Sequence, residues 1–226
     1  MSASVMTDLR KFTQKPAQQV VHPLYDNFGE PLLKSAARAY LDIPEHQRVI
    51  LFFGFIRRYK GLDLLLEAMS LLKQQQAADP GLQVPRLLIA GEFYEDSKMY
   101  MDLIKEHDLG NLLLLKTNFI ADSEVKYYLS AADFVIQPYR NATQSGVTPL
   151  AYHFEKPMLV TNVGGLADLV PHEQSGLVCE PNPTAIAGAI LRLYQLGEDH
   201  FLPHLRREKK KYSWDNLVKA ITALVE

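Results

Sequence analysis

The sequence is poor in the features that would assign it to several common classes of protein. It holds a single cysteine, Cys179, so no disulfide can form within the chain, which fits a reducing compartment. Lysine and arginine (24 residues) nearly balance aspartate and glutamate (26), and such a balance supplies no clustered positive field for a nucleic-acid backbone. No apolar run approaches the roughly 20 residues that a membrane-spanning helix needs, and the first residues lack the apolar core of a signal peptide. We therefore expect a globular cytoplasmic protein without nucleic-acid partners.

Short apolar runs alternate with amphipathic stretches from Val49 onward. Uninterrupted runs of this length are typical of parallel strands that are buried on both faces. They lie at residues 49–55, 86–92, 111–119, 134–137, 158–161 and 176–181. Helical patterns separate them, such as the apolar stripe formed by Leu62, Leu65, Leu66, Met69 and Leu72. The alternation predicts an α/β fold, a doubly wound parallel sheet of about six strands with flanking helices.

Residues 1–45 have a different character. Residues 5–12 have a weak helical pattern, proline, glutamine and glycine punctuate the stretch after them, and clear helical spacing runs from Leu32 until before Pro44. We interpret residues 1–45 as an interdomain linker and lead-in helix, tethered to a part that this chain lacks. Residues 46–226 then form one Rossmann-like domain with C-terminal helices.

The stretch from Phe134 to Gly165 predicts a strand, a polar loop, a helix opening near Ser145, a second strand and a Gly-Gly turn. Backbone N–H groups at a helix start are unsatisfied and carry partial positive charge, which suits a phosphate. The ordinary alternative is that Ser145 only caps the helix. In a doubly wound sheet the ligand lies outside the carboxyl ends of the strands, where this loop follows its strand.

Three cations lie within four positions at the turn after the first strand, Arg57, Arg58 and Lys60. A solvated loop is the simple interpretation of such a cluster. The functional interpretation is a cationic clamp, in which guanidinium and ammonium groups meet the phosphates of a ligand.

An ordered set of five motifs resembles the C-terminal half of the retaining GT-B glycosyltransferases, the "group 1" family. The motifs are GFIRRYKGLDLLLEA, LLIAGE, TNFIADSEVKYYLSAADFVIQPY, VTNVGGLADLV and SGLVCEP. The resemblance runs from about Val20 to the C-terminus. It implies a Rossmann-like nucleotide-sugar-binding domain that acts on a donor, UDP- or GDP-sugar, without a metal or other cofactor.

The resemblance also implies roles for particular residues. Lys60 matches the lysine that contacts the donor diphosphate in the family. The family also has an arginine at the position where this chain has Phe55, so Arg57 or Arg58 must replace it. Of these two we favour Arg57. We therefore take Arg57 and Lys60 as the catalytic candidates. The predicted donor-binding residues are Gly54, Arg58, Gly91, Glu92, Phe119, Ile120, Thr143, Gln144, Ser145, Gly146, Val147 and Thr148, with Phe119 and Ile120 at the nucleobase.

The chain departs from the family at a pair of glutamates eight positions apart, one for the transferred sugar and one for the ribose. Those positions hold Ala142 and Leu150. Hydroxyl and amide groups of the loop can bond sugar oxygens, but they cannot replace a carboxylate. A subgroup with a different loop would explain the change, and loss of activity would explain it equally.

The predicted function is transfer of a hexosyl group, with retention, from the donor to a glycan, lipid or small-molecule acceptor. An N-terminal domain that this chain lacks would hold the acceptor, so we expect the isolated chain to be inactive. A membrane surface would concern only the full-length protein. Two alternatives remain open, a nucleotide-sugar epimerase of related fold and a non-catalytic nucleotide-sugar-binding module.

Overall fold

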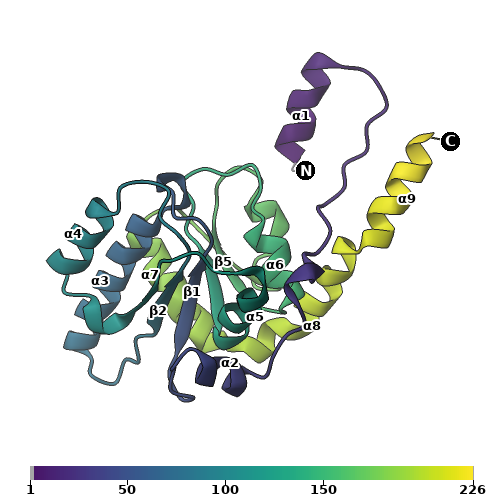
Figure 1. Cartoon of the computed structure of the whole chain (residues 1–226). Coiled ribbons are helices and arrows are strands. Elements are labelled where there is room, and N and C mark those ends of the chain that lie inside the picture. Colours follow the sequence, from purple (N-terminus) through teal and green to yellow (C-terminus); the bar gives the residue numbers. More distant parts are fainter. Residues whose placement is uncertain (1–2, 226) are drawn as a thin grey trace.

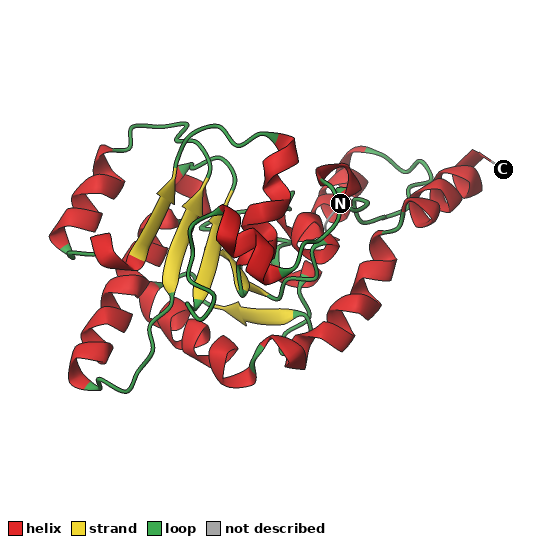
Figure 2. Ribbon diagram, turned by 60° about the horizontal axis from the view of Figure 1, so that its bottom comes forward, coloured by secondary structure: helices red, strands yellow, loops and turns green. Residues whose placement is uncertain are grey.

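The computed structural model describes residues 3–225. Its centre is a six-stranded sheet in the order β3-β2-β1-β4-β5-β6, with every neighbouring pair parallel (Figure 1 and Figure 2). The strands are β1 (Val49–Phe53), β2 (Arg86–Ala90), β3 (Leu113–Lys116), β4 (Phe134–Gln137), β5 (Met158–Thr161) and β6 (Gly176–Cys179). Each strand lies within an apolar run of the sequence, and the predicted doubly wound sheet is confirmed.

Helices cover both faces of the sheet, because right-handed crossovers on the two sides of β1 place them on opposite faces. One face carries α3 (Leu62–Ala78), α4 (Lys98–Glu106) and α7 (Pro183–Leu196), and the other carries α2 (Lys34–Tyr40), α5 (Asp122–Ala131) and α6 (Val147–His153). The chain then continues through α8 (Glu198–Lys209), which packs against α6. The first helix, α1 (Ala3–Phe12), and the last, α9 (Trp214–Val225), extend away from the sheet (Figure 1). Within residues 3–225, no helix combines the length and the apolarity that crossing a bilayer requires.

Local sequence explains where α3 and α7 form. The apolar stripe of α3 faces the core and is almost completely inaccessible to solvent, and α3 begins directly after Gly61. At the start of α7, Asn182 Oδ1 accepts a hydrogen bond of 2.9 Å from the Ala185 amide, and Pro183 occupies the first turn, where its missing N–H is no loss. These short-range signals determine where α3 and α7 begin.

The segment before α2 lies against the domain. The Leu24 amide donates to the Tyr212 carbonyl (2.9 Å), and the Leu32 amide donates to Ser130 Oγ (3.0 Å). Between these points His153 Nε2 lies 2.8 Å from the Gly29 carbonyl oxygen. The segment 22–32 is thereby held along the α5 and α6 side of the sheet, which brings its aromatic residues to the carboxyl ends of the strands.

A cluster of charges occupies the opposite end of the sheet, at the amino ends of β1 and β4. Asp133 accepts hydrogen bonds from the Val49 amide (2.7 Å) and the Tyr194 hydroxyl (3.0 Å). It also pairs with Arg38 and Lys34 at 2.8 Å each, and Arg38 is 4% exposed. This Asp133 network joins α2, β1, β4 and α7 at the end of the sheet away from the predicted site.

Candidate functional site

The turn between β1 and α3 buries a lysine at the carboxyl end of the sheet. Arg58–Lys60 form one turn of 3-10 helix that ends at Gly61, whose φ of 68° is left-handed. A Cβ on Gly61 would stand 2.0 Å from the Pro138 carbonyl oxygen, so only glycine lets the turn approach β4 this closely. A Cβ on Gly54 would stand 3.1 Å from Lys60 Nζ. The two glycines therefore make room for the lysine side chain to fold back toward the end of β1.

The Lys60 ammonium has no counter-ion in the part of the chain that the structure describes. The residue is 8% exposed, and no carboxylate of residues 3–225 lies within salt-bridge distance of its nitrogen. The ammonium lies over the Tyr139 ring, at 5.9 Å from the centroid. Burial, and secondarily the nearby positive charge of Arg57, lower the pKa of Lys60 from 10.5 to about 8. At neutral pH this is a buried cation that an anion would neutralise.

The loop after β4 forms the wall beside Lys60. Ser145 Oγ lies 3.0 Å from the Tyr139 hydroxyl and accepts a hydrogen bond of 3.1 Å from the Val147 amide. Burial raises the pKa of Tyr139, so its hydroxyl stays protonated. Helix α6 starts at Val147 and has seven residues, and one of its first amides is already bonded to Ser145. Ser145 thus bonds an amide at the start of α6, although Gly146 occupies the N-cap position, and Lys60 supplies the positive charge at this place.

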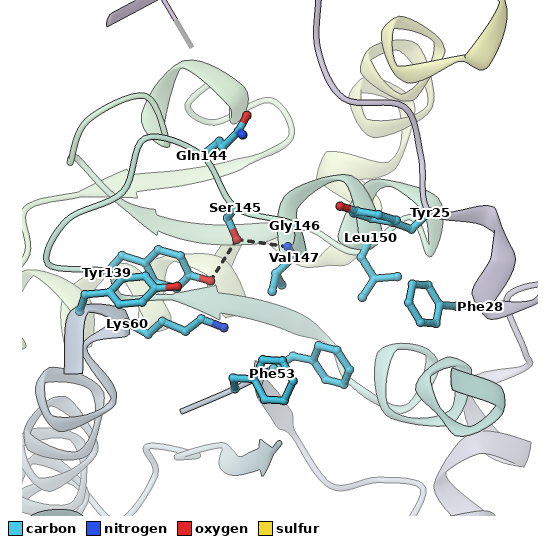
Figure 3. Close-up of a pocket in the computed structure, with 13 residues that line it drawn as sticks. Tyr25, Phe28, Phe53, Lys60, Tyr139, Gln144, Ser145, Gly146, Val147 and Leu150 are labelled. Carbon is cyan, nitrogen blue, oxygen red and sulfur yellow. Dashed lines mark hydrogen bonds between the residues drawn. The ribbon is translucent and has the colours of Figure 1, made fainter. Parts of the chain in front are cut away.

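A cavity of about 260 Å³ opens between the two loops (Figure 3). Lys60 extends into it from one side, and Leu150 and Phe28 stand on the other (Figure 3). Its lining residues are Tyr25, Phe28, Phe53, Gly54, Phe55, Tyr59, Lys60, Tyr139, Gln144, Ser145, Gly146, Val147 and Leu150. No carboxylate lines this first cavity, so Lys60 is the only charged side chain in its lining.

A second cavity of about 220 Å³ continues the first toward β2 and β3. Its lining residues are Phe28, Phe53, Gly54, Phe55, Gly91, Glu92, Phe119, Ile120, Asp122 and Val125. Four of these residues also line the first cavity, so the two form one trough along the carboxyl ends of the central strands. At Gly91, with a φ of 139°, a Cβ would stand 2.4 Å from the Gly54 carbonyl oxygen, so the β1 and β2 turns meet closely beneath the trough.

Most of the predicted site residues line the trough. Gly54, Lys60 and the loop residues 144–147 line the first cavity, while Gly91, Glu92, Phe119 and Ile120 line the second. The 144–147 loop and the turn that carries Lys60, far apart in sequence, thus meet at one site, as the fold class requires.

Four predicted residues line neither cavity. The Arg57 guanidinium lies over the Tyr94 ring, 4.7 Å from its centroid, and Arg58 and Thr143 are exposed outside the lining. Thr148 is completely buried and donates a hydrogen bond of 3.2 Å to Gln137 Oε1. The Thr148 side chain therefore serves the packing of α6 on β4, and the direct role of either arginine stays a prediction.

Sequence reasoning missed the aromatic walls of the trough. Tyr25 and Phe28 come from the segment taken as linker, Phe53 is the last residue of β1, and Phe55 and Tyr139 follow β1 and β4. The three that follow or end strands could have been found, because residues after parallel strands line the crevice. Tyr25 and Phe28 carry no such signal, since only the folded path of the lead-in segment brings them there.

Comparison with known families agrees with this geometry. The profile of the family "Glycosyl transferases group 1" matches residues 34–212, most of the chain. The chain belongs to this family. The matched region contains the whole sheet and the turn that carries Lys60.

Curated members of the glycosyl transferases group 1 family match over most of the chain. It is 26% identical over 200 residues to D-inositol 3-phosphate glycosyltransferase of Jonesia denitrificans, covering 85% of this chain and 46% of that protein. It is also 26% identical over 204 residues to alpha-1,3/1,6-mannosyltransferase ALG2 of Homo sapiens, covering 84% of this chain and 48% of that protein. The chain thus spans about half the length of the curated relatives it matches.

Solved structures confirm the GT-B fold. Sucrose-phosphate synthase of Thermosynechococcus elongatus superposes with a TM-score of 0.77 at 21% identity, over 100% of this chain and 56% of that one. HepE of Anabaena in complex with UDP gives a TM-score of 0.74 at 17% identity, over 90% and 55%. The C-terminal domain of the group 1 glycosyl transferase LpcC of Francisella tularensis gives 0.65 at 18% identity, over 82% and 94%. The chain is therefore the C-terminal type of domain of a GT-B glycosyltransferase.

Proposed function

We propose that this chain is the donor-binding domain of a retaining glycosyltransferase that takes a hexosyl group from a UDP- or GDP-sugar. The observation that carries the proposal is the buried Lys60 ammonium, which faces a cavity and has no counter-ion in residues 3–225. Burying a charge without a partner is unfavourable, and a ligand phosphate would remove that penalty. The UDP complex of the structurally similar HepE supports a nucleoside diphosphate as the ligand.

The trough has the layout that such a donor needs. A diphosphate at Lys60 directs the nucleoside toward the second cavity, which is lined by Phe119 and Ile120, the residues that the family resemblance assigns to the base. The Tyr25 ring lies beside Gly146, and the neighbouring loop residues Gln144 and Ser145 line the first cavity. They are the polar groups available for oxygen atoms near the diphosphate.

Catalysis in this arrangement would be electrostatic. As the bond between the sugar and the diphosphate breaks, negative charge grows on the leaving phosphate, and a fixed ammonium stabilises that charge more than it stabilises the bound donor. Lys60 supplies such a charge without a metal ion. The first cavity offers no carboxylate for general acid or base chemistry, which favours group transfer over epimerisation.

We further propose that the acceptor, a glycan, lipid or small molecule, binds in a part of the enzyme outside these residues. The trough is open on its outer side, and the chain covers about half of each relative. On this proposal the isolated chain binds the donor and transfers no sugar.

Thermal melting with nucleotides tests the proposal. Because Lys60 addresses the diphosphate, UDP or GDP at saturating concentration should raise the melting temperature more than UMP or GMP does. A Lys60→Met variant should lose the advantage of the diphosphate, while a matched variant of an exposed helical lysine, Lys105→Met, should keep it. Equal shifts with mono- and diphosphates in the unmodified chain would contradict the assignment.

A further inference from the structure

The stretch where the two cavities meet has a distinct composition. Phe28, Phe53, Gly54 and Phe55 line both cavities, between Lys60 at one end and Phe119 at the other. A nucleoside diphosphate places its ribose between its base and its phosphates. On the proposed function, the ribose of the donor therefore lies on this shared stretch.

The shared stretch offers the ribose no polar side chain. Three of its four residues are phenylalanine, and Leu150 adjoins them from α6, facing the cavity beside Phe28 (Figure 3). A side chain that recognises a ribose hydroxyl needs a donor or an acceptor, and a carboxylate bonds it most strongly. Phenylalanine and leucine have neither.

The polar side chains of the trough lie outside the shared stretch, and Gln144 belongs to the loop of the first cavity. Glu92 and Asp122 line only the second cavity, toward the base. The Tyr139 and Ser145 hydroxyls are bonded to each other. The Tyr25 hydroxyl lies at the loop, where a Cβ on Gly146 would stand 3.5 Å from it.

We infer that this trough does not recognise the ribose 2′-hydroxyl, so that deoxyribonucleoside diphosphate sugars serve as donors as readily as ribonucleoside ones. Leu150 and Phe28 are the residues that set this tolerance, because they hold the wall where a polar side chain would contact the sugar ring. The inference rests on the proposed function and narrows its substrate class.

Deoxythymidine diphosphate suits this trough. The second cavity is lined by Phe119, Ile120 and Val125 besides the shared phenylalanines, so the methyl group of thymine would meet apolar surface. Burial of one methyl group corresponds to roughly a threefold gain in affinity. The expected order of affinity is dTDP above dUDP, with dUDP equal to UDP.

Calorimetric titration of the chain with UDP, dUDP and dTDP decides the inference, because UDP and dUDP differ only in the 2′-hydroxyl. Dissociation constants of UDP and dUDP within about threefold of each other support it. A preference of about tenfold or more for UDP, the size of a hydrogen bond to a charged group, overturns it. If neither UDP nor dUDP binds, the proposed function itself is contradicted. A preference for UDP contradicts only the inference about the ribose.

Two variants test the assigned residues. Leu150→Gln and Phe28→Gln each place an amide on the wall, and at least one should create a preference of several-fold for UDP over dUDP. Leu150 is 4% exposed, so Phe28, which is half-buried on the lead-in segment, provides the variant less prone to misfolding. Phe12→Gln, at a side chain 87% exposed and outside both cavities, is the matched control and should leave the ratio unchanged. No change in ratio for either folded wall variant would overturn the assignment of the wall.

Discussion

The two ends of the sheet each hold a buried lysine, and the two lysines differ in what surrounds them. Lys60, at the carboxyl ends, and Lys156, at the amino ends, are each 8% exposed, and burial lowers the pKa of each to about 8. Lys156 donates a hydrogen bond of 2.8 Å to the Ala132 carbonyl and lies 3.7 Å from Glu198. Lys60 has no such partner in residues 3–225. The pKa is lowered to a similar value at the two sites. Only the interaction partners distinguish a lysine with a structural role from one that is free to bind a ligand.

The comparison separates stability from function within one sheet. At the amino end the cations of α2 and Lys156 pair with Asp133 and with Glu198 of α8, so these charges neutralise one another. At the carboxyl end no carboxylate of residues 3–225 offsets the unfavourable burial of the Lys60 charge. An anionic ligand that pairs with Lys60 would remove this penalty, and the free energy recovered would strengthen its binding. Substitutions at the two ends should therefore act on different measurements.

The largest effect is expected at the amino end. Asp133→Ala would leave the buried Arg38 guanidinium and Lys34 without their carboxylate and should lower the free energy of unfolding by about 3 to 5 kcal/mol. Denaturant unfolding measures this. Asp102→Ala, which removes a carboxylate 60% exposed from its pair with Lys98 on α4, is the matched control and should change stability by less than about 1 kcal/mol. A loss of similar small size for both variants would contradict the assigned importance of the Asp133 network.

At the carboxyl end the sign of the stability change should be opposite. Lys60→Met removes a buried charge without a partner, so we expect the unliganded protein to gain roughly 1 to 3 kcal/mol at pH 7. The same variant should bind UDP at least about tenfold more weakly, as expected for loss of a charged hydrogen bond. Because the folded pKa of about 8 lies below the ordinary 10.5, unfolding takes up a proton between these values, and the stability of the unmodified chain rises with pH there. The gain from Lys60→Met should accordingly shrink above pH 8.

Lys156→Met is the paired experiment. The pKa of Lys156 is lowered as far as that of Lys60, so removing its charge also favours the folded state, but the variant leaves the Ala132 carbonyl without its donor and Glu198 without one of its cations. The stability gain should therefore be clearly smaller than that of Lys60→Met, and UDP binding should stay unchanged. Urea unfolding at pH 7 and calorimetric titration of both lysine variants give the full comparison. If Lys156→Met stabilises the protein as much as Lys60→Met does, the partners of the lysines do not explain the difference between the two ends.

The sequence predicts the fold well, because the information is local. Each strand is a short apolar run, and runs such as Val49–Phe53 and Phe134–Gln137 are buried on both faces, as their composition indicates. Lys60 and the 144–147 loop could be placed at one site because parallel strands bring their carboxyl ends together. These inferences need only periodicity and the general rule for such sheets.

The rest of the site depends on contacts across the fold. Phe28 reaches the trough because His153 holds the Gly29 carbonyl, an interaction between residues 124 positions apart that no local pattern encodes. By composition alone Thr148 belongs to the polar loop, but α6 turns its hydroxyl toward Gln137. Arg57 turns toward Tyr94, a residue of the next turn. In each case the direction of a side chain, and not its identity, decided the outcome.

The smallest expected effect concerns Arg57 and the pH dependence of binding. The Lys60 ammonium is the form that attracts phosphate, so the affinity for UDP should be constant below the pKa of Lys60, about 8, and should fall as pH rises through it. Arg57 contributes to the lowering of that pKa, while its guanidinium lies over Tyr94 outside both cavities. Arg57→Ala should therefore shift the midpoint of the fall upward by roughly a few tenths of a pH unit, with little change in affinity at pH 7. Arg58→Ala is the matched control and should leave the midpoint in place. Titrations of UDP between pH 7 and pH 10 measure the midpoints, and a loss of tenfold or more at pH 7 in Arg57→Ala would show that Arg57 leaves Tyr94 and binds the diphosphate itself.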